Sequence, residues 1–263
     1  MSISTEANLF QRKKERISQV KEKIKASGFI SVNELYSFFD CSEQTIRRDL
    51  QYLESIGEIQ RQYGGVFYVQ KDDDVGETFD KRLTRNIEAK KEIANKASSL
   101  ISPNLTIAID SSTTSYYLAK VLPNISLNII TNSFYIADLL VQNPKYKVTC
   151  IGGIINPKHK DLVLPDLSMP TNIDGMTIDM TFISCGAIDL PTGIYDINQG
   201  IVNIKKLMIK QSNMVVLLSN ESKFNKKTKY KICVLSDIDF IVSDSSLDNQ
   251  TRKKIHELNI NVI

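Results

Sequence analysis

The sequence predicts an α/β protein in which an N-terminal winged helix-turn-helix is followed by a doubly wound α/β domain. Three observations support this fold class. Residues 1–69 combine helical spacing of apolar residues with a tight turn and a hairpin pattern. Residues 70–85 begin with an acidic stretch that is nearly devoid of apolar residues, so we expect a linker there. In residues 86–263, short apolar runs alternate with helical patterns, as in a parallel sheet covered by helices.

The first helix is predicted over residues 10–26. Ile17, Val20 and Ile24 recur at steps of three and four, and Lys and Arg occupy other positions. Gly28 is expected to end this helix.

A helix-turn-helix is predicted next. Ser31 stands three residues before Glu34, which is the spacing of a capping box, so a short helix is expected over residues 32–39. Asp40 and Cys41 leave room only for a tight turn, and Ser42 is a suitable N-cap for a second helix.

The second helix of this pair carries residues suited to reading DNA. Ile46, Leu50 and Leu53 share one face, which we expect to pack inward. Arg can donate two parallel hydrogen bonds to guanine and Gln two to adenine, and the first turns of such a helix enter the major groove. The side chains predicted to point wholly or partly away from the core, toward duplex DNA, are those of Gln44, Thr45, Arg47, Arg48 and Gln51.

A wing is predicted after Gly57, which is expected to close the helix. Apolar residues and a Gly64-Gly65 pair over residues 59–68 favour a β-hairpin, in which Arg61 is placed to reach a phosphate.

The charges on the second helix allow another interpretation, namely a solvated face with an internal ion pair. We adopt it for Asp49. For Arg47 and Arg48 it does not explain their position on the second helix of a compact unit beside a glycine-containing wing.

Composition sets wider limits. The 263 residues have a net charge of +3, which is too small to indicate a nucleic-acid partner without the placement argument above. No apolar run approaches the roughly 20 residues of a membrane span and no signal peptide is evident, so we expect a cytoplasmic protein. Cys41, Cys150, Cys185 and Cys233 form no Cys/His cluster, so we expect reduced thiols, no metal and no cofactor.

The second domain is predicted to be a doubly wound sheet. Its expected strands are residues 106–109, 127–131, 147–151, 180–184, 215–219 and 240–242, and its expected helices are residues 86–99, 114–121, 134–141, 202–210 and 249–258. Such sheets bind ligands beyond the carboxyl ends of their strands, where loops lead into helices.

Polar residues occupy three of those loops. Asp110, Ser111, Ser112, Thr113 and Thr114 follow the first strand and suit a phosphate; Thr131, Asn132 and Ser133 follow the second; Ser222, Lys223 and Phe224 add a cation after a later one. Each loop by itself is better explained by ordinary helix caps.

The features of both predicted domains are explained together by resemblance to one family. The run from Cys41 to Leu50, with Leu53, Glu54, Gly57, Arg61 and the Gly64-Gly65 pair, resembles the DeoR family of bacterial repressors. That resemblance implies an effector domain similar in fold to ribose-5-phosphate isomerase, which senses phosphorylated sugars. It also implies that effector-binding residues are the loops 110–114 and 131–133, Gly152, Gly153, Lys205 and Lys223.

The sequence also departs from the family pattern. Ser111 and Ser112 stand where a glycine is common, and Asn220 and Glu221 stand where an aspartate usually precedes Ser-Lys-Phe. The stretch 162–166 lacks an expected glycine, and Gln199-Gly200 lies where a glutamate is usual.

Three functions are compatible with this sequence. The first is a repressor of carbohydrate-metabolism genes that assembles as a dimer or tetramer and is released by a phosphorylated sugar. The second is a sugar-phosphate isomerase, which needs a carboxylate base; residues 185–189 keep only Asp189 of the isomerases' acidic loop, and His159 and His256 lie in no catalytic motif. The third is a DNA-binding protein whose second domain only oligomerises. We predict the first, a regulator that is not an enzyme.

Overall fold

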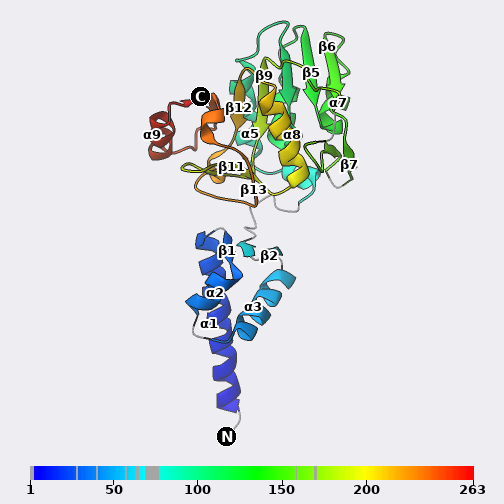
Figure 1. Ribbon diagram of the computed structural model, residues 1–263. Coiled ribbons are helices and arrows are strands. Elements are labelled where there is room, and N and C mark those ends of the chain that lie inside the picture. The colour runs from blue at the N-terminus through cyan, green and yellow to red at the C-terminus, as the bar shows by residue number, and fades with distance from the viewer. Residues whose placement is uncertain are drawn as a thin grey trace. The chain divides into compact units, whose positions relative to one another are not determined.

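A computed structural model describes residues 3–27, 29–39, 41–56, 58–62, 65–68, 77–157, 159–168 and 171–263 (Figure 1). The chain divides into two compact units, residues 1–75 and 76–263. The turn and linker predictions at Gly28, Asp40, Gly57, Gly64 and residues 70–76 lie outside the described residues.

The first unit is a three-helix unit with a small antiparallel sheet. Its helices are α1 (Ile3–Ser27), α2 (Val32–Phe38) and α3 (Glu43–Ser55), and its strands β1 (Phe29–Ser31), β2 (Ile59–Gln62) and β3 (Gly65–Tyr68) pair in the order β1-β3-β2. Val20, Leu35, Ile46, Leu50 and Leu53 are buried in its core.

Local sequence explains where these helices begin. The Ser31 hydroxyl accepts a hydrogen bond from the Glu34 amide, and the Ser42 hydroxyl accepts one from the Thr45 amide, as the N-cap predictions required. Strand β1 was not predicted, because three residues are too few for a period-two pattern to be visible. A side chain at Gly65 would collide with the ring of Phe29, so glycine at this position lets β3 lie against β1.

The second unit is a doubly wound α/β domain. Its main sheet has seven parallel strands in the order β15-β14-β12-β9-β4-β5-β6, with β4 (Thr106–Ile109), β5 (Leu127–Thr131), β6 (Tyr146–Cys150), β9 (Met180–Ser184), β12 (Val215–Leu218), β14 (Phe240–Val242) and β15 (Asn261–Val262). Its long helices are α5 (Ile87–Ser98), α6 (Thr113–Lys120), α7 (Phe134–Leu140), α8 (Gln199–Lys210) and α9 (Asn249–Glu257).

Alternate residues of each strand serve two apolar cores, one on each face of the sheet. Ile107 and Ile109 of β4 pack in the core that α5, α6 and α7 cover, whereas Ala108 faces the core that α8 and α9 cover. This division confirms the doubly wound fold class.

Several short elements were not predicted. They are the hairpin of β7 (Ile154–Asn156) and β8 (Asp161–Val163), a small sheet of β10 (Ala187–Asp189), β11 (Gly193–Asp196) and β13 (Tyr230–Cys233), the 3-10 turns η1 (Glu221–Lys223) and η2 (Leu235–Asp237), and helix α4 (Phe79–Leu83). Helix α4 lies within the expected linker, where Thr78 caps it and Phe79 is buried. Among the described helices, none is both long and apolar enough to cross a bilayer.

Candidate functional site

Helix α3 presents a polar face, as predicted. Gln44, Arg47, Arg48 and Gln51 are exposed and Thr45 is half-buried. The Thr45 hydroxyl lies 2.8 Å from the Ser42 hydroxyl, so it contributes to the helix cap. Within the described part of the chain, no salt bridge holds Arg47 or Arg48.

The interpretation of Asp49 as part of a solvated face was wrong. Asp49 is only 1% exposed, and its two carboxylate oxygens accept hydrogen bonds from Arg16 of α1 at 2.6 and 3.2 Å. The hydrogen bond with Asp49 raises the pKa of Arg16 above its usual value. This pair joins α1 to α3 and neutralises the buried carboxylate of Asp49.

Arg61 lies on strand β2 of the wing, opposite Val66 of β3. Its backbone amide donates a hydrogen bond to the Glu54 carboxylate at 3.1 Å, and its side chain is half-buried. The wing is therefore tied to the end of α3 through the backbone of Arg61.

In the second unit, Asp110 organises the loop after β4. One carboxylate oxygen accepts hydrogen bonds from the Ser112 amide at 3.1 Å and the Ser115 hydroxyl at 2.5 Å. The other accepts from the Ser184 amide at 2.9 Å. Asp110 is only 1% exposed, so its carboxylate holds the loop in place through hydrogen bonds within the protein.

Lys205 of α8 is the cation beneath this loop. Its ammonium group donates to the Ser184 carbonyl at 2.6 Å and the Asp196 carboxylate at 2.6 Å, and lies 3.2 Å from the Asp110 carboxylate. Burial would lower the pKa of Lys205, but the two carboxylates outweigh it, so its pKa is raised above the usual lysine value. An ammonium has three donors, and three acceptors surround this one.

Ser111, Asn132 and Asp161 form a buried hydrogen-bonded cluster. The Asn132 amide nitrogen donates to the Ser111 hydroxyl at 3.2 Å and to the Leu162 carbonyl at 3.0 Å. The Ser111 hydroxyl donates to Asp161 Oδ2 at 3.0 Å. Asp161 was not predicted as a site residue.

The remaining residues of these loops start helices. Ser112 caps α6 by accepting from the Ser115 amide, and Ser133 caps α7 by accepting from the Ile136 amide. Thr131 accepts a hydrogen bond from the Ser133 amide at 3.2 Å. Thr113 is buried and Thr114 is half-buried in the first turn of α6, at the carboxyl end of β4.

Gly152 and Gly153 follow β6 and are exposed. The Gly152 amide donates to the Asn172 side chain at 2.9 Å. A Cβ at Gly153 would lie 2.7 Å from the Val163 carbonyl oxygen, so the approach of the β7–β8 hairpin explains this glycine.

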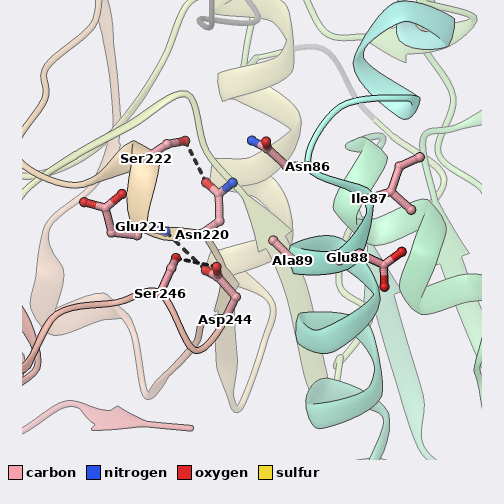
Figure 2. A pocket seen from close by; sticks show the side chains of 9 residues that line it. All are labelled: Asn86, Ile87, Glu88, Ala89, Asn220, Glu221, Ser222, Asp244 and Ser246. Carbon is pink, nitrogen blue, oxygen red and sulfur yellow. Dashed lines mark hydrogen bonds between the residues drawn. The ribbon is translucent and has the colours of Figure 1, made fainter.

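Lys223 ends the 3-10 turn η1 after β12. Its charge lies close enough to Cys185 to lower the pKa of that thiol, although burial, the larger effect, raises the pKa to about 12. The preceding residues line a cavity of about 420 Å³ (Figure 2). Its walls are the first turn of α5, the loop after β12 and the loop after β14, and the lining residues are Asn86, Ile87, Glu88, Ala89, Asn220, Glu221, Ser222, Asp244 and Ser246.

The structure thus joins some predicted residues and separates others. Asp110 and Lys205 form one buried network, and Ser111 and Asn132 form the adjacent cluster. Gly152 and Gly153 lie in neither. Sequence reasoning missed Asp161 and Asp196. The partner of Asp161, Ser111, lies 50 positions away, and the partner of Asp196, Lys205, lies nine positions away; no local pattern marks either carboxylate.

The family model described as "DeoR-like helix-turn-helix domain" matches residues 16–72, and the one described as "DeoR C terminal sensor domain" matches residues 85–245. An uncharacterized HTH-type transcriptional regulator of Bacillus subtilis, YulB, is 32% identical over 94% of this chain and 95% of its own length. The L-fucose operon activator of Haemophilus influenzae is 34% identical over 88% of this chain and 91% of its own. Ribose 5-phosphate isomerase A of Methanocaldococcus jannaschii aligns with a TM-score of 0.40 at 18% identity over 54% of this chain and 56% of that chain, a likeness too distant to bear on activity.

Proposed function

Because this chain belongs to the DeoR family of transcriptional regulators, we propose that α3 and the wing bind an operator and that a phosphorylated sugar in the sensor domain changes this binding. The DNA contacts are assigned to Gln44, Thr45, Arg47, Arg48 and Gln51, with Arg61 on a phosphate. The regulated genes are those of carbohydrate metabolism, as the name of the H. influenzae relative suggests.

The observation that carries the DNA assignment is the charge arrangement on α3. Asp49 is buried and neutralised by Arg16, whereas Arg47 and Arg48 on the same helix are exposed. Exposed guanidinium groups near the capped N-terminus of a helix can donate hydrogen bonds to guanine edges in the major groove and to the neighbouring phosphates.

The effector assignment rests on the loops at the carboxyl ends of β4 and β5. Helix α6 begins at Thr113 and α7 at Phe134, so the first amides of both helices lie at this edge of the sheet. We assign phosphate binding to the loop Ser111–Thr114. We assign a positioning role to Asp110 and Lys205, because Lys205 already forms ion pairs with Asp110 and with Asp196.

The same pairing favours a sensor over an isomerase. A general base must reach a substrate proton, but Asp110 accepts three internal hydrogen bonds and Lys205 is surrounded by three internal acceptors. Asp189, the acid retained in the motif, accepts a hydrogen bond from the Thr192 hydroxyl. No turnover of pentose or hexose phosphates is expected; a rate that is lost on replacing Asp189 would overturn this.

The test is binding of the full chain to DNA from its own upstream region, followed by fluorescence anisotropy. Titrations are repeated with ribose 5-phosphate, fructose 1-phosphate, fructose 6-phosphate, glucose 6-phosphate and the same sugars without phosphate. Specific binding that one phosphorylated compound shifts, and its free sugar does not, is the expected result. Specific binding that no compound shifts would favour a domain that only oligomerises.

Two further parts of the proposal need their own readouts. Sedimentation of the full chain measures assembly, for which a symmetric dimer or tetramer is expected because paired heads on repeated half-sites raise affinity. In-vitro transcription measures the direction of control. Repression is the expectation from the family, and activation is the alternative that the name of the H. influenzae relative supplies.

A further inference from the structure

The cluster of Ser111, Asn132 and Asp161 contains more acceptors than donors. Asn132 is 1% exposed and Asp161 3% exposed, so neither side chain reaches bulk water. Asn132 Oδ1 and Asp161 Oδ1 have no hydrogen-bond partner within the described part of the chain. A buried acceptor without a donor is costly, and such atoms call for a specific explanation.

The protein fixes the direction in which these oxygens are presented. Both hydrogens of the Asn132 amide are used, by Ser111 Oγ and by the Leu162 carbonyl, so flipping the amide would set two oxygens against each other. The one hydroxyl hydrogen of Ser111 is used by Asp161 Oδ2. No donor in this chain of bonds is left for the two remaining oxygens.

Backbone pairing holds the cluster at the effector loops. The Leu162 amide donates to the Asn132 carbonyl at 2.8 Å, and the Phe134 amide donates to the Lys160 carbonyl at 3.1 Å. These two hydrogen bonds hold residues 160–162, which include Asp161, against the loop between β5 and α7. On the other side, Ser111 belongs to the loop assigned to phosphate.

The geometry points to a hydroxyl-binding subsite, in which Asp161 Oδ1 and Asn132 Oδ1 accept hydrogen bonds from hydroxyl groups of the polyol part of a phosphorylated ligand. This inference rests on the proposed function, because it takes the neighbouring loop as the phosphate site. Hydroxyl groups supply the donors that the cluster lacks, and a carboxylate acceptor makes the bond charge-assisted.

The electrostatics agree with a neutral, donating ligand group at Asp161. Burial raises the pKa of Asp161 to about 6. Hydrogen bonds with Ser111 and with the Asn156 side chain, and the charges of Arg82 and Lys205, oppose this rise. A hydroxyl group that donates to the Asp161 carboxylate offsets the cost of its desolvation without adding charge. Arg82 of α4 also keeps a buried Nε without a hydrogen-bond partner in the described residues, so a cationic donor lies near the same group.

The test is calorimetric titration of the full chain and its Asp161→Ala variant. Asp138→Ala, at an exposed position of α7, is the matched control. The probes are the four sugar phosphates above, the monodeoxy analogues of the tightest binder, and inorganic phosphate. Asp161→Ala is expected to weaken the sugar phosphate at least tenfold and to leave inorganic phosphate within twofold, because only the hydroxyl contacts are lost.

The deoxy analogues make the test independent of the variant's folding. In the wild-type chain, one analogue should bind at least tenfold more weakly than the parent, and Asp161→Ala should not weaken that analogue further. Equal affinities for parent and all analogues, or equal losses of sugar phosphate and inorganic phosphate in Asp161→Ala, would mean that the acceptors serve buried water and would overturn the subsite. If the wild-type chain binds no sugar phosphate, the proposed function itself fails and this inference fails with it.

Discussion

Helix α3 and the loop after β4 use the same kinds of charged residue in opposite ways. On α3, Arg47 and Arg48 are exposed, and the nearby carboxylate of Asp49 is turned inward to Arg16. Beneath the β4 loop, Lys205 is 3% exposed and surrounded by Asp110, Asp196 and a carbonyl. A cation near a candidate site is therefore not by itself a ligand-binding group. Its exposure and its existing partners decide whether it contacts a ligand or holds the fold.

Removing Lys205 is the strongest way to test this contrast. Lys205→Met leaves the buried carboxylate of Asp110 and the half-buried carboxylate of Asp196 without their cation. It should lower the free energy of unfolding by about 3–5 kcal/mol, as measured by urea denaturation. Lys210→Met, at an exposed position of the same helix, should change it by less than about 1 kcal/mol. If Lys205→Met were as stable as Lys210→Met but lost only sugar phosphate binding, Lys205 would be a ligand-binding group after all.

The second test concerns Asp161, whose carboxylate is proposed to favour ligand binding but is expected to lower the stability of the fold. Folding raises the pKa of Asp161 from 3.8 to about 6, so its carboxylate carries no penalty below pH 3.8 and its full penalty above pH 6. Asp161→Asn should therefore be more stable than wild type at pH 7.5, by roughly 1–3 kcal/mol, and the difference should vanish toward pH 4.

A matched control with the opposite sign is available on the neighbouring loop. The hydrogen bond from the Ser168 amide lowers the pKa of the exposed Asp166. That carboxylate stabilises the fold above its unfolded pKa and loses this effect as the pH falls, so Asp166→Asn should gain nothing at pH 7.5. Urea denaturation of both variants at pH 4.5 and 7.5 provides the comparison. A stability gain for Asp161→Asn that does not depend on pH would contradict the assigned cause.

The sequence predicted what local pattern controls. The N-caps at Ser31 and Ser42 and the bounds of β4, β5, β9 and β14 agree with the structure, because capping residues and continuous apolar runs act within a few positions. The short strands β10, β11 and β13 were missed because their antiparallel pairing joins segments that carry no pattern of their own.

The site residues show the same limit. Asp49 stands three positions after Ile46, on the apolar face of α3, so spacing could have indicated its burial, whereas its partner Arg16 lies 33 positions away. Asp161 meets Ser111 across 50 positions. An expected phosphate loop was visible as a run of hydroxyl residues, but which of its groups are already occupied depends on contacts that no local pattern encodes.

The third test returns to α3. Arg47→Ala or Arg48→Ala should cost about 1–3 kcal/mol of operator binding free energy if that side chain reads a base, with little effect on unfolding because both side chains are exposed. Anisotropy with operator and with random duplex gives the comparison. Equal losses on both DNAs would assign the arginine to phosphate contact instead.

The smallest loss of DNA affinity is expected for Arg61→Ala, and it serves as the reference for a contact that does not depend on DNA sequence. Its backbone is fixed by Glu54 and by pairing with Val66, so Arg61→Ala should leave the wing in place while removing one cation. Affinity should fall alike for operator and random DNA, and the slope of log affinity against log salt should decrease by about 1, since one phosphate contact releases about one counterion. An unchanged salt slope together with lost operator preference would move Arg61 from the phosphate backbone to a base, and the wing would then share sequence readout with α3.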